Sequence, residues 1–102
     1  MALPIFRAAG AKATDGTIPL SVVPDLPAGM SANDIVILVA CVETGGVAVI
    51  TSAGSVGTWN AITSTPVDPG ADNKLYVWWG RWSSGTTGPT ITSDLDHIIA
   101  AT

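Results

Sequence analysis

The sequence predicts an all-β protein: an antiparallel β-sandwich of about eight short strands, jelly-roll-like in type, with a small barrel as the alternative. Three observations lead to this fold class. Val, Ile and Thr, the β-branched residues that favour strands over helices, supply 31 of the 102 residues. Eleven Gly and seven Pro interrupt the chain so often that long helices are excluded over most of its length. Between these interruptions, short apolar runs alternate with turn signals roughly every 8–12 residues, the spacing of strands in a sandwich.

The expected strands follow the apolar runs along the chain. They are residues 3–8, 17–23, 34–43, 47–51, 58–65, 73–82, 89–92 and 96–101. Segment 34–43 is the longest and most apolar, which places it in the centre of a sheet and buried on both faces. Segment 47–51 is expected to pair back on it through residues 44–46, whose two glycines suit a hairpin. The remaining connections carry the Pro, Gly, Asp and Ser residues typical of turns.

Alternate residues of the two most apolar strands are expected to form the core. These are Ile35, Ile37, Val39, Val77 and Trp79. The whole chain is large enough for one such core and too small for two, so residues 1–102 form a single domain.

The aromatic strand 73–82 is the sharpest feature of the sequence. Because neighbouring strand residues point to opposite faces, Tyr76, Trp78 and Trp82 share the face away from Trp79. We expect these three side chains to be partly exposed and to form a binding surface, with Leu75, Val77 and Trp79 packed in the core. Tyr and Trp are enriched at interfaces and at sugar-stacking platforms. The alternative is that all the tryptophans belong to the core. In either case, Trp59 is expected to pack over one end of the sandwich.

The last expected strand, 96–101, is apolar and carries neither Lys nor Pro. An edge of this kind invites pairing with another chain. We therefore expect the edge at Ile98 and Ile99, or the sheet face beside it, to be covered by a neighbouring subunit or by a continuation of the protein, of which this chain would then be the amino-terminal part.

The charged residues argue against several classes of partner. Four basic and eight acidic residues give a net charge of −4, and no two basic residues are adjacent. Binding to nucleic acid or to an anionic membrane draws on clustered Lys and Arg, so neither is expected. Only 12% of residues are charged, which suggests a surface largely covered by partners, the alternative being a soluble monomer with an exterior rich in Ser and Thr. Cys41, the single cysteine, reads as a buried thiol, and the amino terminus lacks the pattern of a secretion signal.

Catalytic and metal-binding motifs are hard to assemble from this chain. A Ser93–His97–Asp96 triad is disfavoured, because adjacent strand residues point to opposite faces. The Asp94/Asp96 and Asp68/Asp72 pairs fit solvated turns better than glycoside hydrolysis. The oxygen-rich loop 68–73 matches no calcium-binding spacing. We expect no enzymatic activity, no cofactor and no metal.

Four segments together resemble a structural module of tailed-phage and prophage virions. They are Leu-Pro-Ala-Gly at 26–29, Asn-Asp-Ile opening the apolar strand at 33–35, a glycine loop before Trp59, and Leu-Tyr-Val-Trp-Trp at 75–79. The similarity spans roughly residues 2–101, and the chain has Gly-Thr-Trp where relatives often have Gly-Trp. Relatives usually continue into further β-structure.

The resemblance implies a non-enzymatic virion component, such as a tail appendage, a fibre base or a capsid decoration. Such a protein is made in the host cytoplasm and docks onto other virion proteins, with homo-oligomers expected. The alternative is a receptor- or carbohydrate-binding module of a tail fibre, in which Tyr76, Trp78 and Trp82 would contact a host-surface glycan.

Overall fold

The computed structural model describes residues 5–16, 20–43, 45–62, 66–67, 73–94 and 98–102. Within these residues the elements are β1 (Ala13–Asp15), β2 (Leu20–Val22), β3 (Ile35–Glu43), β4 (Ala48–Ser52), the 3-10 helix η1 (Gly54–Val56), β5 (Asn60–Ala61), β6 (Asn73–Arg81), β7 (Thr90–Ser93) and β8 (Ile98–Ala101). The predicted all-β fold class is confirmed.

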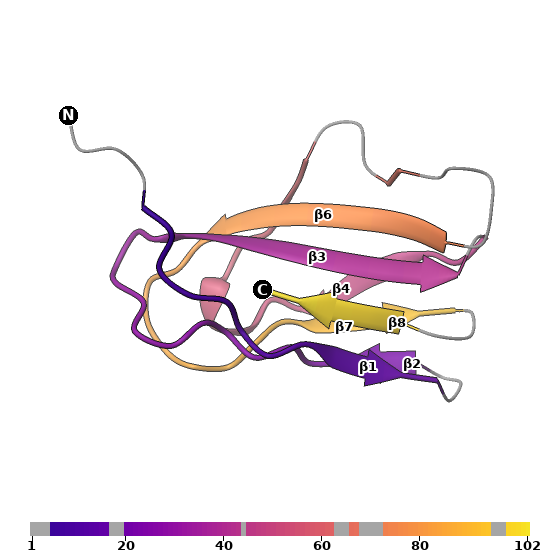
Figure 1. The fold of residues 1–102 in the computed structure, drawn as a ribbon, viewed down its shortest axis with the longest axis horizontal. Helices are drawn as coiled ribbons and strands as arrows, with labels where there is room; N and C mark the ends of the chain where they lie inside the picture. Colours follow the sequence, from indigo (N-terminus) through magenta and orange to yellow (C-terminus); the bar gives the residue numbers. More distant parts are fainter. Residues whose placement is uncertain (1–4, 17–19, 44, 63–65, 68–72, 95–97) are drawn as a thin grey trace.

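Two antiparallel sheets pack face to face. The five-stranded sheet has the order β1-β8-β3-β6-β5, and the three-stranded sheet has the order β2-β7-β4. Figure 1 looks onto the five-stranded sheet, with the three-stranded sheet behind it. The first strand pairs with the last, the second with the seventh and the third with the sixth, which is the nested pairing of a jelly roll. β5 departs from that scheme, because it pairs with β6 rather than joining β4.

The predicted hairpin between segments 34–43 and 47–51 is wrong. β3 already has β8 on one side and β6 on the other, so no edge of it is left for β4. The chain instead crosses to the three-stranded sheet, where β4 pairs with β7. Two hydrogen bonds hold this crossing in place. The Val47 N–H donates to the Asp94 carboxylate at 2.7 Å, and the Tyr76 hydroxyl donates to the Gly46 carbonyl at 3.3 Å.

Other strand boundaries agree with expectation to different degrees. Segments 34–43, 73–82, 89–92 and 96–101 correspond closely to β3, β6, β7 and β8. Of the strand expected at 3–8, residues 5–8 form no strand and residues 3–4 lie outside the described ranges; β1 is the first strand among the described residues. The described part of the strand expected at 17–23 contains β2, and that of the strand expected at 58–65 contains β5, whereas residues 17–19 and 63–65 lie outside the described ranges.

β8 is an interior strand, so the expected open edge at Ile98 and Ile99 is wrong. Antiparallel pairing with β1 covers one side of β8 and pairing with β3 the other. The Ile98 side chain points between the sheets and is almost completely buried. The amino-terminal segment reinforces this arrangement, because the Gly10 N–H donates to the Thr102 carbonyl at 2.8 Å.

The core lies between the sheets. Its buried residues are Leu20, Val22, Leu38, Ala40, Val42, Ala48, Ile91, Ile98 and Ala100, with Ala13, Ile50, Trp59, Tyr76 and Trp78 packed against them. Trp59 packs against this core, and its indole N–H donates to the Ala53 carbonyl at 2.9 Å.

Gly80 allows the segment after η1 to pack closely on β6. A Cβ at this position would collide with a methyl group of Val56 and lie 2.7 Å from the Thr58 carbonyl oxygen. Since Gly80 pairs with the buried Val36, it belongs to the inner face of the sheet. The absence of a side chain here therefore lets Val56 close this part of the core.

The expected core assignment of β3 and β6 is wrong in its choice of face. Ile35, Ile37, Val39, Val77 and Trp79 lie on the outer face of the five-stranded sheet. The alternate residues of both strands fill the core instead. β3 is central, as predicted, but it is buried on one face only.

Candidate functional site

The outer face of the five-stranded sheet is built from apolar rows that run across the strands. Paired residues in a sheet share a face, so the register determines the rows. We call this surface the apolar face. It comprises Ile35, Ile37, Val39 and Cys41 of β3, Leu75, Val77 and Trp79 of β6, and Ile99 and Ala101 of β8.

Large parts of these side chains are open to solvent. The exposed fraction rises from 36% for Val39 to 44% for Ile37 and 50% for Ile35. Ile62 and Val67 extend the exposed apolar surface beside β6, where their backbones bond to Val77 and Leu75. The largest contiguous apolar patch on a soluble protein is often a site of interaction.

The opposite outer face, on the three-stranded sheet, has a different composition. Ser21, Thr92 and Val49 form one row across its three strands, and Thr90 lies beside them on β7. Three of these four side chains carry hydroxyl groups, which water can solvate. Val23 and Val47, at the ends of the strands of this sheet, are also about half exposed. The apolar face is therefore the more continuously apolar of the two and the better suited to a protein partner.

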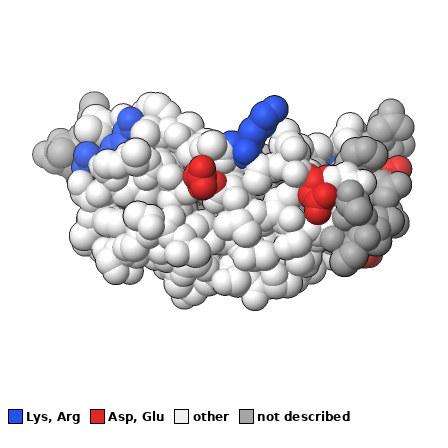
Figure 2. Space-filling view, turned by 90° about the horizontal axis from the view of Figure 1, so that it is seen from below, with Lys and Arg blue, Asp and Glu red and all other residues white. Residues whose placement is uncertain are grey.

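The surface of the molecule carries few charged side chains. Figure 2 shows one edge of the sandwich, where a few separated Lys, Arg, Asp and Glu side chains interrupt an otherwise uncharged surface. Only 12% of the residues in the chain are charged, about half the roughly 25% of an ordinary globular domain.

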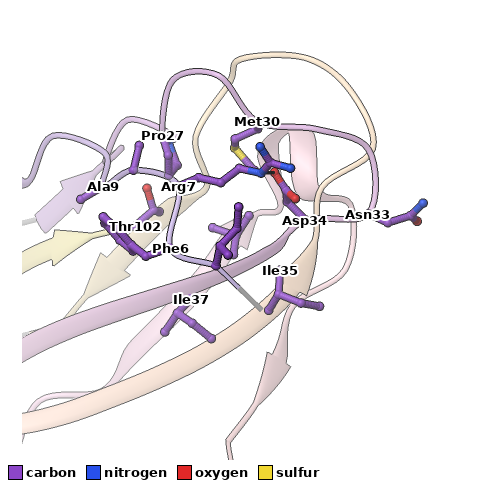
Figure 3. Close-up of a pocket in the computed structure, with 13 residues that line it drawn as sticks. Phe6, Arg7, Ala9, Pro27, Met30, Asn33, Asp34, Ile35, Ile37 and Thr102 are labelled. Carbon is purple, nitrogen blue, oxygen red and sulfur yellow. Dashed lines mark ion pairs between the residues drawn. The ribbon is translucent and has the colours of Figure 1, made fainter. Parts of the chain in front are cut away.

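A pocket of about 490 Å³ lies at the end of the apolar face where β3 begins. The amino-terminal segment, the turn before β3 and the first residues of β3 surround it (Figure 3). Ile35 and Ile37 belong both to this pocket and to the apolar face, so the two surfaces are continuous. Ile5 and Phe6, on the amino-terminal segment, are 74% and 84% exposed. They add apolar area at this end.

An ion pair holds the amino-terminal segment to the turn before β3. The Arg7 Nε lies 2.7 Å from an Asp34 carboxylate oxygen, drawn as a dashed line in Figure 3. The backbone N–H of Ser31 donates to the same carboxylate at 2.7 Å. This backbone hydrogen bond, assisted by Arg7, holds the pKa of Asp34 below its ordinary value. The carboxylate therefore stays ionised at neutral pH and fixes both segments.

The structure separates the five residues predicted as binding residues. Tyr76 and Trp78 lie on the inner side of β6, where their rings stack with centroids 5.5 Å apart and planes 10° from parallel. Ile98 is buried in the core, whereas Ile99 projects onto the apolar face. The indole N–H of Trp82 donates to the Gly85 carbonyl at 3.0 Å, in the turn after β6. The expected split, with Leu75, Val77 and Trp79 inside, is reversed, and a role of the five residues in binding stays a prediction.

The residues weighed for catalysis or metal binding serve local structure where they are described. Ser93 is buried, and the Asp94 carboxylate accepts the hydrogen bond from Val47. Asp68, Asp72, Asp96 and His97 lie outside the described residues. Within the described ranges, no three His, Cys, Asp or Glu side chains gather closely enough to hold a metal ion. Nor does any helix there have the length and hydropathy to cross a membrane. Cys41, expected to be buried, is partly exposed on the apolar face.

Comparison of the chain with protein-family models, with curated proteins and with solved structures finds no match in any of the three.

Proposed function

We propose that this protein is a non-catalytic structural module that docks onto neighbouring proteins of a larger assembly through its apolar face. The contrast between the two outer faces carries the proposal. Ile, Val, Leu and Trp side chains cover one face, whereas the other combines Ser21, Thr90 and Thr92 with exposed Val side chains. Leaving aliphatic side chains in water costs free energy that a partner removes, at about 25 cal/mol per Å² of apolar surface buried.

We propose further that the assembly is the virion of a tailed phage, with this chain as an exterior appendage or decoration. The support is the resemblance of segments 26–29, 33–35 and 75–79, together with Trp59, to phage structural modules. The scarcity of clustered Lys and Arg is consistent with contacts to protein rather than to packaged nucleic acid. The module is made in the host cytoplasm and reaches the virion by assembly.

Incorporation into particles tests this proposal. Particles purified from a producing host should contain the chain, detected by mass spectrometry. Ile37→Asp places a charge on the apolar face and should reduce incorporation roughly tenfold or more, because a buried unpaired charge is costly. Val49→Asp is the matched control: Val49 is 49% exposed on the opposite outer face, so its substitution should leave incorporation unchanged. Absence of the chain from particles, or equal incorporation of both variants, would contradict the proposal.

A further inference from the structure

The charges on the apolar face lie at its two ends. Among the paired residues of this face, Arg81 stands opposite Ile35 at one end, and Glu43 stands opposite Asn73 at the other. Every row of residues paired across β8, β3 and β6 between them is uncharged; the exposed Lys12 lies beside the middle of the face, two residues before Thr14, which continues the Cys41–Ile99 row onto β1. Since eight residue steps separate positions 35 and 43, the two ends are about 26 Å apart at roughly 3.3 Å per residue. Along β3 and β6 the face is therefore positive at one end, negative at the other and apolar between.

Neither charge is neutralised by an oppositely charged side chain within the part of the chain that the structure describes. The ion pair found there joins Arg7 to Asp34. The Arg81 guanidinium has a long hydrogen bond of 3.4 Å to the Asn33 carbonyl, and both Arg81 and Glu43 are exposed. A partner seated on the apolar face would meet these two charges at its rim, where polar and charged groups of interfaces are found.

The face is complementary to itself. A two-fold axis that lies in the face, perpendicular to the strands and near the Val39–Val77 row, reverses the strand direction of the second copy. The Arg81 end of each copy then covers the Glu43 end of the other, which gives two equivalent charge contacts. An axis parallel to the strands would instead bring like charges together, at a cost. The charge pattern thus selects one of the two simple face-to-face arrangements.

The size of the face suits the centre of a dimer interface. Across β8, β3 and β6, with strands about 4.8 Å apart, it covers on the order of 350 Å² in projection. A standard interface buries about 800 Å² per partner, and its centre is apolar and often contains Trp. Ile5, Phe6, Ile62 and Val67 extend the apolar area around that centre.

We infer that a second copy of this chain packs on the apolar face, related by the two-fold axis perpendicular to the strands, with Arg81 of each copy against Glu43 of the other. Two sheets packed this way lie about 10 Å apart with their strands within about 30° of each other, a separation that Arg and Glu side chains bridge. The inference rests on the proposed function, because it names the partner of the same face.

Sedimentation equilibrium of the 102-residue chain and its charge variants tests the inference. The mass of the wild-type chain should rise with concentration from 10.3 kDa toward twice that value. Arg81→Glu and Glu43→Arg should each weaken the dimer roughly tenfold or more, because each brings like charges together. The double variant should return to within about threefold of the wild type, since it restores opposite charges. Thr92→Glu, on the opposite outer face, should leave the dimer unchanged.

Two results would overturn the inference. One is a wild-type chain that stays monomeric up to about 1 mM. The other is a dimer whose affinity in the double variant falls by the sum of the two single losses, instead of returning toward the wild-type value. Near-ultraviolet circular dichroism of the tryptophans shows whether each variant is folded. Either result leaves the incorporation of the Ile37→Asp and Val49→Asp variants to decide separately whether the face docks onto a different virion protein.

Discussion

Ile37 and Leu38 are neighbours in β3, yet their side chains lie on opposite faces of the five-stranded sheet. The Leu38 side chain is completely buried between the sheets, whereas that of Ile37 is 44% exposed on the apolar face. Leu38 pairs with Trp78 and Ile37 with Trp79, so the division continues across β6. The inner row builds the core, and the outer row offers a surface for docking.

Truncation of these two neighbours should have very different effects on stability. Leu38→Ala removes a fully buried side chain and should lower the free energy of unfolding by about 2–5 kcal/mol. Ile37→Ala should lower it by about 1 kcal/mol or less in the monomeric chain, because much of that side chain is already in water. Urea unfolding, followed by tryptophan fluorescence at a concentration where the chain is monomeric, measures both values. Equal losses for the two variants would show that the assignment of faces is wrong.

The sequence predicts the fold class and most strand positions, because β-branched runs between Gly and Pro depend on local chemistry alone. It does not decide which face of β3 is inside, because positions 35–42 are apolar without exception. Alternation identifies the core only when the two faces differ in polarity. The sequence did contain one indication of the outer face. In β3, Glu43 lies on the same face as Ile35 and Ile37, and in β6, Arg81 lies on the same face as Trp79. Because charged residues favour the solvent face, these two positions indicate that this face is the outer one.

The connection after β3 was predicted wrongly for a different reason. Gly45 and Gly46 are typical of a hairpin, and this local preference is real, since Gly45 adopts a φ of +91°. Yet β6 and β8, distant in sequence, occupy both edges of β3. A segment of five or six residues does not indicate which strands, distant in sequence, will pair with its neighbour. For the same reason, the interior position of β8 could not be predicted from segment 96–101 alone.

Gly80→Ala should destabilise the protein by about 1–3 kcal/mol, the usual cost of overpacking. The new methyl group would collide with Val56 and crowd the Thr58 carbonyl oxygen. The double variant with Val56→Ala should lose less stability than the sum of the two single losses, since the smaller side chain relieves one collision. Thermal unfolding of the four proteins gives this comparison. Strictly additive losses would mean that Gly80 does not accommodate Val56.

The Asp34 carboxylate should make stability depend on pH in the acidic range. Its pKa in the folded state is lowered, first by the Ser31 N–H and then by Arg7, so the ionised form favours folding. This contribution is fully present above the ordinary Asp pKa of about 3.9 and is lost as the pH falls through the lower folded value. The difference in stability between the wild type and Asp34→Asn should therefore be constant from pH 7 to about pH 5 and shrink below pH 4.

Arg7→Gln provides the control for the cause of this shift. Because the Ser31 N–H is the larger influence, the carboxyl of Asp34 should keep a lowered pKa in that variant, as measured by NMR titration. A wild-type advantage over Asp34→Asn that does not change between pH 7 and pH 2.5 would contradict the assignment.

Cys41 provides the most direct measurement of the central claim, because this single thiol of the chain lies on the apolar face, partly exposed. Its rate of alkylation should be at least roughly tenfold lower in the assembled particle than in the dilute isolated chain, since docking removes the face from solvent. Thr92→Cys in a Cys41→Ser background places the thiol on the opposite outer face as the matched control, and its rate should be the same in both states. If Cys41 reacts as fast in the particle as in the free chain, the apolar face is not covered and the account is wrong.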